Sequence, residues 1–302
     1  MIISASRRTD IPAYYSYWFY NRIKEGFVLT RNPRNYKQVS KISLAPDMID
    51  GIVLWTKNPL PMLDRLDELE KYMYYFHFTI TAYGNDIEPK LPHKTDTLLP
   101  AFKSLSKTIG AGRVIWRYDP ILLNEKYTMD YHICAFEKIA AELSGFTQKV
   151  VISFIETDYR GVKGNTKELA LNGFPIELKM ELASRLAQIA IGKGLAIEAC
   201  AQSLELTQYG IGAARCIDGG LLSKLLGYEP RVKKDKNQRP FCGCTSSVDI
   251  GVYNTCGNGC KYCYANYNPG TIANNAGKHK SQSAFMIDET NCSNPQKTAG
   301  PL

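Results

Sequence analysis

Three cysteines fall within eight residues, in the stretch Cys256-Gly-Asn-Gly-Cys260-Lys-Tyr-Cys263. The spacing C-x3-C-x2-C lets one short loop place three thiolates around a single small metal centre, and Gly257 and Gly259 allow the backbone to turn without a Cβ penalty. Electron-transfer clusters are usually held by four cysteines. Three cysteines leave one iron of a four-iron, four-sulfur cluster open, so the loop predicts a cluster that can bind a further ligand.

A structural zinc site is the alternative interpretation of this region. Cys242 and Cys244, together with Cys260 and Cys263, could supply the four thiolates of a tetrahedral zinc ion. That arrangement gives Cys256 no ligand role, and it ignores the strand that alternating apolar residues predict just before the loop. We therefore favour iron–sulfur ligation by the three cysteines of the loop.

Four further cysteines lie between the sixth and seventh predicted strands or beside them: Cys200, Cys216, Cys242 and Cys244. They could hold a second, fully ligated four-iron cluster that relays electrons or anchors a substrate. A zinc ion and simple burial as free thiols are the alternatives. Cys134 lies on the apolar face of a predicted helix, where we expect a packed core residue, and Cys292 lies in a polar tail.

Length and composition suit a soluble α/β protein. The chain has 302 residues, of which 44% are hydrophobic and 22% charged. Neither a run of about 20 apolar residues nor a signal-peptide pattern is present, so we expect a cytoplasmic protein without a membrane partner. In that compartment nine cysteines are more readily ligands than disulfides. The net charge of +8 favours a polyanionic partner such as nucleic acid, although most charged runs are only solvated surface.

Strand and helix patterns alternate along the chain. The predicted strands are residues 2–5, 51–55, 75–81, 113–118, 150–155, 195–199 and 248–253. The predicted helices are residues 12–25, 62–73, 95–109, a helix beginning near 129 and residues 176–191. This order predicts a partial or full (β/α) barrel of parallel strands. We expect residues 1–268 to form a single barrel domain that includes the cysteine-rich segment 200–264, and residues 269–302 to be a weakly ordered tail.

Polar residues follow the predicted strands, at the ends where parallel barrels build their sites. Polar strand ends are also common simply because they meet solvent, but a whole set of them favours a site. The candidates for catalytic contacts are Arg117, Asp119 and Glu156. The candidates for cofactor contacts are Ser4, Ser6, Thr9, Lys57, Asn58 and, from the cysteine loop, Tyr262.

Several segments carry a family resemblance. They are Ser6-Arg-Arg-Thr-Asp10, Trp55-Thr-Lys-Asn-Pro59, Trp116-Arg-Tyr-Asp-Pro120, Arg215-Cys-Ile-Asp218, Cys256 and Tyr264-Ala-Asn266. Together they resemble a bacterial family called domain of unknown function 1848. The cysteine loop is similar to that of the radical S-adenosylmethionine superfamily, and residues 56–59 and 117–120 resemble its spore photoproduct lyase-like branch.

The resemblance implies a mechanism. A cluster held by Cys256, Cys260 and Cys263 would bind S-adenosylmethionine at its open iron, and one electron would cleave the sulfonium to give a 5′-deoxyadenosyl radical that abstracts hydrogen from a substrate. Tyr262 would lie beside the adenine. A low-potential donor such as flavodoxin or ferredoxin would supply the electron. A nucleic-acid lesion or modified base is the candidate substrate, from the basic composition and the lyase-like segments.

The chain departs from the superfamily pattern in two ways. The loop follows the last predicted strand and not the first, which implies a circularly permuted barrel in which residues 248–253 pair with residues 2–5. The Gly-Gly-Glu motif that often grips the cofactor amine is missing, and Ser4, Ser6 or Thr9 would take its role. Two other functions remain open: a zinc-stabilised nucleic-acid-binding module and a non-catalytic iron–sulfur electron carrier.

Overall fold

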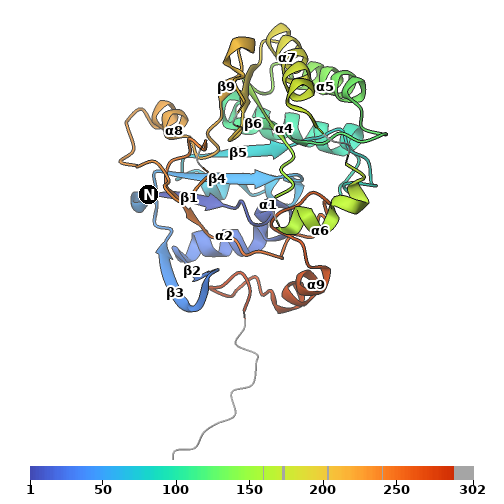
Figure 1. The fold of residues 1–302 in the computed structure, drawn as a ribbon. Helices are drawn as coiled ribbons and strands as arrows, with labels where there is room; N and C mark the ends of the chain where they lie inside the picture. Colours follow the sequence, from blue (N-terminus) through green and yellow to red (C-terminus); the bar gives the residue numbers. More distant parts are fainter. Residues whose placement is uncertain (159, 172–173, 203, 240, 289–302) are drawn as a thin grey trace, which may run out of the picture.

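A parallel β-sheet with helices packed on it forms the body of the protein (Figure 1). The computed structural model describes residues 1–288 except for 159, 172–173, 203 and 240. The eight strands, in their spatial order, are β10 (Val248–Asp249), β1 (Ile2–Ala5), β4 (Gly51–Thr56), β5 (Tyr74–Thr79), β6 (Val114–Ile121), β7 (Lys149–Phe154), β8 (Ala196–Ala199) and β9 (Gly212–Ala213). All neighbouring pairs are parallel. The sheet has two ends, β10 and β9, as in a partial barrel.

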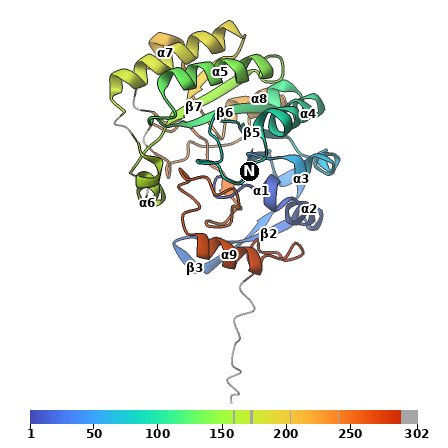
Figure 2. The same ribbon diagram turned by 90° about the vertical axis from the view of Figure 1, so that its right-hand side faces the viewer.

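Helices flank this sheet. They are α1 (Ile11–Tyr14), α2 (Ser16–Glu25), α3 (Leu60–Leu63), α4 (Leu99–Ile109), α5 (Met129–Leu143), α6 (Arg160–Leu169), α7 (Ile176–Gly192), α8 (Gly219–Leu226) and α9 (Pro269–Lys278). Most of them pack on the large core of one face, whereas α8 packs through Leu222 in a smaller core on the other. Figure 2 shows α7, α5, α4 and α3 following one another around the outside of the sheet. The predicted helix 12–25 is broken at Tyr15, and the predicted helix 62–73 is replaced by α3 and a 3₁₀ turn at Leu66–Leu69.

Alternation along each strand sends neighbouring side chains to opposite faces. In β4, Ile52 and Leu54 pack into the large core under the helices, whereas Val53 belongs to a second, smaller core on the other face. Tyr75 of β5 and Ile115 of β6 also belong to the second core. We call this second face the inner face, and it carries the polar side chains discussed below.

The strand before the cysteine loop lies beside the first strand of the chain. Ile3 pairs with Val248 and Ser4 pairs with Asp249, in parallel. This adjacency confirms the pairing expected for these two segments. The strand is shorter than predicted: β10 ends at Asp249, because Gly251 and Val252 turn away into the loop, and Ile250 keeps only a backbone hydrogen bond to Ser4.

Two elements differ from the sequence-based expectations. An antiparallel hairpin of β2 (Phe27–Asn32) and β3 (Asn35–Ser43), which no pattern predicted, stands apart from the main sheet. The expectation of a weakly ordered tail from residue 269 is corrected by α9, which Asn268 caps by accepting a hydrogen bond from Thr271 N. Residues 289–302, including Cys292, lie outside the described residues. Within the described part, no helix is long and apolar enough to cross a membrane.

Candidate functional site

The cysteine loop is held by a network of amide side chains. The side-chain oxygen of Asn266 accepts hydrogen bonds from the backbone of Thr255 at 2.8 Å and of Cys256 at 2.9 Å. Its amide nitrogen donates to Arg8 O at 3.0 Å. The backbone N–H of Asn254 donates to Ala265 O at 3.0 Å, which closes the loop at its base. These bonds fix both ends of the loop against the chain that follows β1.

Close packing fixes the centre of the loop. A Cβ on Gly257 would lie 2.7 Å from the ring of Tyr14, so only glycine fits this approach, and Gly259 adopts a positive φ of 69°. The Tyr14 hydroxyl donates to Asn258 at 2.8 Å, and Asn258 in turn donates to Asp10 at 3.2 Å. The cysteine loop is therefore a rigid turn, with Cys256 and Cys260 buried and Cys263 half-buried.

Asp10 connects the loop to the ends of two strands. It caps α1 through a bond from Ala13 N at 3.0 Å, and it accepts a bond from Lys57 N at 2.7 Å, just after β4. Burial raises the pKa of this carboxyl, although the surrounding donors, Lys57 N foremost, act to lower it. Asp10 thereby places the loop over the carboxyl ends of β1 and β4.

A buried carboxylate with two lysines lies beside Cys260. Glu88 is 1% exposed, and it accepts bonds from Lys57 Nζ at 2.9 Å, Lys94 Nζ at 2.6 Å, Thr81 Oγ1 at 2.9 Å and the Tyr262 hydroxyl. Burial acts to raise the pKa of Glu88, but the two ammonium groups outweigh it and lower the pKa to about 2. The group carries a net positive charge at neutral pH.

Lys57 faces the cysteine loop directly. Its ammonium lies 5.3 Å from the centre of the Tyr262 ring. Burial acts to lower the pKa of Lys57, yet the neighbouring Glu88 carboxylate, with a smaller effect from Cys260, raises it overall. The pKa of Cys260 is raised to about 12, mainly by burial. The predicted cofactor residues Lys57 and Tyr262 therefore belong to one site with the loop.

The second set of cysteines also gathers. The sulfurs of Cys200 and Cys216 are 3.6 Å apart. Cys244 is a further neighbour of the Cys216 sulfur, and Cys242 adjoins Cys244. All four pack together in the inner-face core with Tyr75 and its neighbours, whereas Cys260 belongs to a different apolar cluster. The four thiols thus gather in one cluster, apart from the Cys260 cluster. Their prediction as a metal site stays a prediction.

Arg117 and Asp119 lie next to this four-cysteine group. Arg117 donates from Nη1 to the Cys216 sulfur at 3.1 Å and from Nε and Nη2 to Asp119. Burial acts to lower the pKa of Arg117, but Asp119 and Cys216 raise it well above its usual range. His77 on β5 lies nearby, with Nε2 2.8 Å from Cys216 O and Nδ1 without a partner among the described residues.

Of the remaining predicted residues, some hold the strands next to the loop in place and others make contacts elsewhere. Ser4 and Ser6 donate to Asp249 at 2.7 and 2.6 Å, so they tie β1 to β10. Asn58 accepts a bond from Leu60 N in a local turn. Glu156 pairs with Arg239 at 2.6 Å, and Arg239 O accepts a bond from Cys242 N at 3.0 Å, so Glu156 is linked to the four-cysteine group through Arg239.

Thr9 is different from these residues. It is 6% exposed, and its hydroxyl has no hydrogen-bond partner among the described residues. A buried, unpaired hydroxyl costs stability unless a ligand satisfies it. Thr9 is thus a plausible ligand contact beside the cysteine loop.

The number and spacing of the cysteine sulfurs can be compared with what zinc and iron–sulfur sites require. Within the described residues, no group of three or more His, Cys, Asp or Glu side chains is arranged around one metal ion. Tetrahedral zinc with bonds of about 2.3 Å would need all its sulfurs about 3.8 Å apart. A four-iron cluster is several atoms wide and needs its thiolates further apart. The loop supplies three free thiols, of which those of Cys256 and Cys260 are buried, and thiolates are the donors that hold iron–sulfur clusters.

Sequence reasoning missed several site residues. Glu88 and Lys94 follow β5 in the segment 83–94, and a buried carboxylate there was detectable only as one more charge after a strand. The roles of Asp10 and Asn258 could not be predicted, because they depend on a contact between residues far apart in the sequence. Cys134, expected in the core, is exposed on α5.

The family comparison covers this whole arrangement. The model of the family described as "Domain of unknown function (DUF1848)" matches residues 2–265, from β1 through the cysteine loop. No curated protein matches the sequence. The matched range includes Asp10, Lys57, Glu88 and both cysteine groups, and it ends just before Asn266. The chain belongs to the domain of unknown function 1848 family.

Proposed function

We propose that this protein is a radical S-adenosylmethionine-type enzyme whose cluster is held by Cys256, Cys260 and Cys263. The observation that supports it best is the rigid three-cysteine loop lying against the buried Lys57–Glu88 pair at the carboxyl ends of the strands. When bound there, a four-iron cluster with one open iron would pass an electron to S-adenosylmethionine and release a 5′-deoxyadenosyl radical.

The residues of the chain have distinct roles in this proposal. The ammonium of Lys57 and the free hydroxyl of Thr9 would hold polar groups of the cofactor. Glu88 keeps Lys57 charged although it is buried, because the carboxylate stays ionised down to a pH of about 2. Tyr262 covers the lysine and excludes water. Ser4 and Ser6 act indirectly, since both are engaged by Asp249 and hold β1 against the loop.

The four-cysteine group would hold the second metal centre. Arg117 next to Cys216 offsets thiolate charge, and Asp119 is close enough to influence the charge of both Lys57 and Cys200. The Arg117–Asp119 pair therefore belongs to the surroundings of the four-cysteine group and also affects the charge of Lys57. The 3.6 Å separation of the Cys200 and Cys216 sulfurs is close to the spacing of a tetrahedral zinc site, where the ion would have a structural role. A second four-iron cluster, which would relay electrons toward the loop, would need these thiols to move apart.

The test is metal analysis and cofactor cleavage with anaerobically purified protein. We expect iron and sulfide in the protein and, with a strong reductant, 5′-deoxyadenosine from S-adenosylmethionine. Replacing the three loop cysteines by Ala should abolish cleavage, whereas Cys134→Ala, an exposed control, should leave it unchanged. Zinc without iron would refute the proposal. Bound iron without any cofactor binding would indicate an electron carrier.

A further inference from the structure

The β2–β3 hairpin is a basic arm. Residues 27–46 contain Arg31, Arg34, Lys37 and Lys41 and no Asp or Glu. Residues 32–41 are all exposed, on both faces of the two-stranded ribbon. None of the four cations forms an ion pair within the residues that the structure describes; Arg31 and Lys41 instead lie over the rings of Phe285 and Phe27. The arm therefore presents unneutralised positive charge to solvent.

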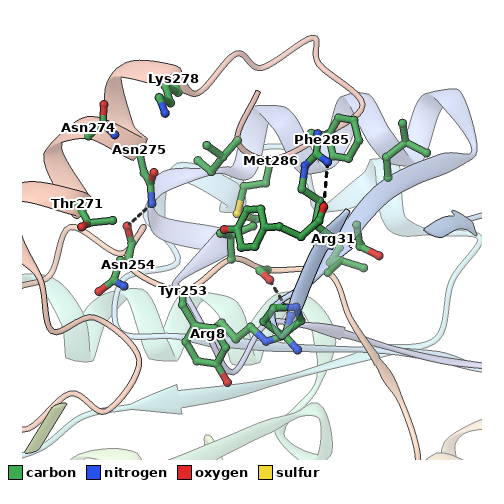
Figure 3. Close-up of a pocket in the computed structure, with 18 of the residues that line it drawn as sticks. Arg8, Arg31, Tyr253, Asn254, Thr271, Asn274, Asn275, Lys278, Phe285 and Met286 are labelled. Carbon is green, nitrogen blue, oxygen red and sulfur yellow. Dashed lines mark hydrogen bonds between the residues drawn. The ribbon is translucent and has the colours of Figure 1, made fainter. Parts of the chain in front are cut away.

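A cavity of about 390 Å³ opens at the base of this arm (Figure 3). Its walls are the hairpin, the segment 250–254 after β10, helix α9 and residues 285–287. Arg8, Arg31 and Lys278 line it, and none of the described lining residues is acidic. The volume lies within the range of about 300–1,000 Å³ typical of small-ligand pockets.

Flat cationic and aromatic surfaces face this cavity. Figure 3 shows Arg31 with Phe285 on one side and Arg8 with Tyr253 below. The guanidinium of Arg31 lies 4.5 Å from the centre of the Phe285 ring, and that of Arg8 lies 5.2 Å from the Tyr253 ring. Such stacked pairs leave guanidinium N–H groups directed sideways, where they can meet a phosphate.

Amide groups line the opposite wall. Asn274 and Asn275 come from α9, and Figure 3 shows them with Lys278 on that helix. Asn275 donates to Asn254 O at 3.0 Å and so fixes α9 against the loop segment. Amide side chains both donate and accept hydrogen bonds, as the edge of an unpaired base requires.

The cavity shares residues with the cysteine loop. Arg8 donates to Gly251 O at 3.1 Å, and its own carbonyl accepts the bond from Asn266 that anchors Cys256. Asn254 lines the cavity two residues before Cys256. A ligand that fills the cavity would therefore touch the same segments that hold the proposed cluster.

We propose that the hairpin and this cavity bind a single-stranded nucleic acid, with backbone phosphates on the arm and one nucleotide in the cavity. Cations provide the phosphate contacts, and exposed rings offer stacking surfaces for bases: Tyr36 is 50% exposed, Tyr267 46% and Tyr253 37%. A base of a single strand can enter the cavity without the cost of a few kcal/mol that flipping a paired base out of a duplex carries. The binding stands on these residues alone; that the strand is also the substrate rests on the proposed function.

The test is fluorescence anisotropy with labelled single-stranded DNA and RNA, duplexes of the same sequence, and salt titration. Single strands should bind more tightly than duplexes, and log affinity should fall with log salt by about 0.7 per phosphate contact. The variant Arg34→Glu/Lys37→Glu should weaken binding at least tenfold and flatten the salt slope. The control Lys138→Glu/Lys193→Glu makes the same charge change on exposed parts of α5 and the end of α7, and should bind almost normally.

A second variant addresses the cavity. Lys278→Glu should weaken single-strand binding while leaving the melting temperature unchanged, because Lys278 has no ion pair within the described residues.

Equal losses in hairpin and control variants would overturn the proposal, as would tighter duplex binding, or binding only to vesicles of anionic lipid. Strand binding that persists in the loop-cysteine variant, with no cofactor cleavage by wild type, would reject the proposed function and keep this inference. Cofactor cleavage without strand binding would reject this inference and keep the proposed function.

Discussion

The guanidinium of Arg117 donates from Nη1 to the Cys216 sulfur at 3.1 Å while its other nitrogens are directed at Asp119. The Arg117 and Asp119 side chains are only 8% and 15% exposed. Loss of one member of a buried ion pair leaves the other charge uncompensated and costs about 3–5 kcal/mol.

Arg117→Met should therefore destabilise the protein by about that amount in chemical denaturation, because Asp119 is left buried alone. The double variant Arg117→Met/Asp119→Leu should recover much of the loss, since no buried charge remains. Recovery of stability in the double variant would show that the single variant is destabilised by the uncompensated charge of Asp119 and not by lost packing. A single variant as stable as wild type would show that the pair is not buried in solution.

The four-cysteine group predicts a second metal. Replacing Cys200, Cys216, Cys242 and Cys244 by Ser should remove one metal centre per chain, measured by elemental and sulfide analysis. If both centres are four-iron clusters, iron should fall from about eight to about four per chain. Cofactor binding at the Cys256 loop should survive, because the loop belongs to a separate apolar cluster. An unchanged metal content would contradict this assignment.

Gly257 offers a steric test of the loop. A methyl group at this position would lie 2.7 Å from the Tyr14 ring, which is held by its bond to Asn258. Gly257→Ala should cost about 1–3 kcal/mol through overpacking and should lower iron content. Gly277→Ala is the matched control, because nothing lies within 4 Å of its added carbon and a helical alanine is favoured by about 0.5–1 kcal/mol. Similar behaviour of both variants would argue against a tightly packed loop.

Glu88 gives a charge test. Glu88→Gln should destabilise the fold by about 3–5 kcal/mol, because Lys57 and Lys94 would share a buried site without a counter-ion. The control Glu68→Gln removes the partner of Arg65 at a position where both side chains are 34% exposed, and should cost under about 1 kcal/mol. Urea denaturation of both variants measures the difference. Equal costs would mean that water screens Glu88.

Two buried histidines predict acid sensitivity. Burial lowers the pKa of His77 and of His132 to about 4, from 6.5. Because each pKa is lower in the folded state, their contribution to stability is complete above pH 6.5 and is lost as the pH falls toward 4, by about 3 kcal/mol for each. The pKa of Glu88 is lowered from 4.5 to about 2, so its contribution to stability is lost only as the pH falls from 4.5 toward 2. Most of that range lies below the range in which the histidines titrate.

The His132 contribution can be isolated. His132 Nδ1 lies 2.7 Å from the Tyr118 hydroxyl and Nε2 lies 2.8 Å from Leu122 O, which satisfies a neutral ring. His132→Gln should lower stability at pH 7.5 but also reduce the loss between pH 6.5 and 4.5, measured by denaturant midpoints. An unchanged pH slope would show that this ring is not the source.

The main strands were predictable from sequence because buried parallel strands read as short apolar runs between helices. Gly51–Thr56 and Lys149–Phe154 lie within a residue or so of their predicted limits. The hairpin was missed because β3 is polar and almost wholly exposed, and β2 has only the short apolar run Phe27–Leu29, so the pair carries no clear core pattern. Helix α9 was missed because Asn and Gly dominate it; its cap at Asn268 and its packing beside the loop compensate for weak propensity.

The sequence predicted the cysteines of the site and, among the polar residues, Lys57 and Tyr262 beside the loop. The spacing of Cys256, Cys260 and Cys263 identified the loop, and the number of remaining cysteines suggested the second group. Cysteines can be predicted in this way because their thiolates bind metals and few other side chains do. Arg117 was expected near the cofactor, whereas its described contacts are with Cys216 and Asp119. Polar residues after strands are common, so their partners depend on contacts that only the folded chain defines.

The pairing of β1 with β10 has a consequence for how the protein is made. Ser4 donates to Asp249, which lies 245 residues later in the chain, so β1 is synthesised long before the strand that pairs with it. Until then β1 exposes an unpaired edge, which invites wrong strand pairing. Such a long closure is slow to form. A metal held by the cysteine loop, as proposed above, would load only after both segments are made, and a chain stalled before β10 would carry an open sheet edge.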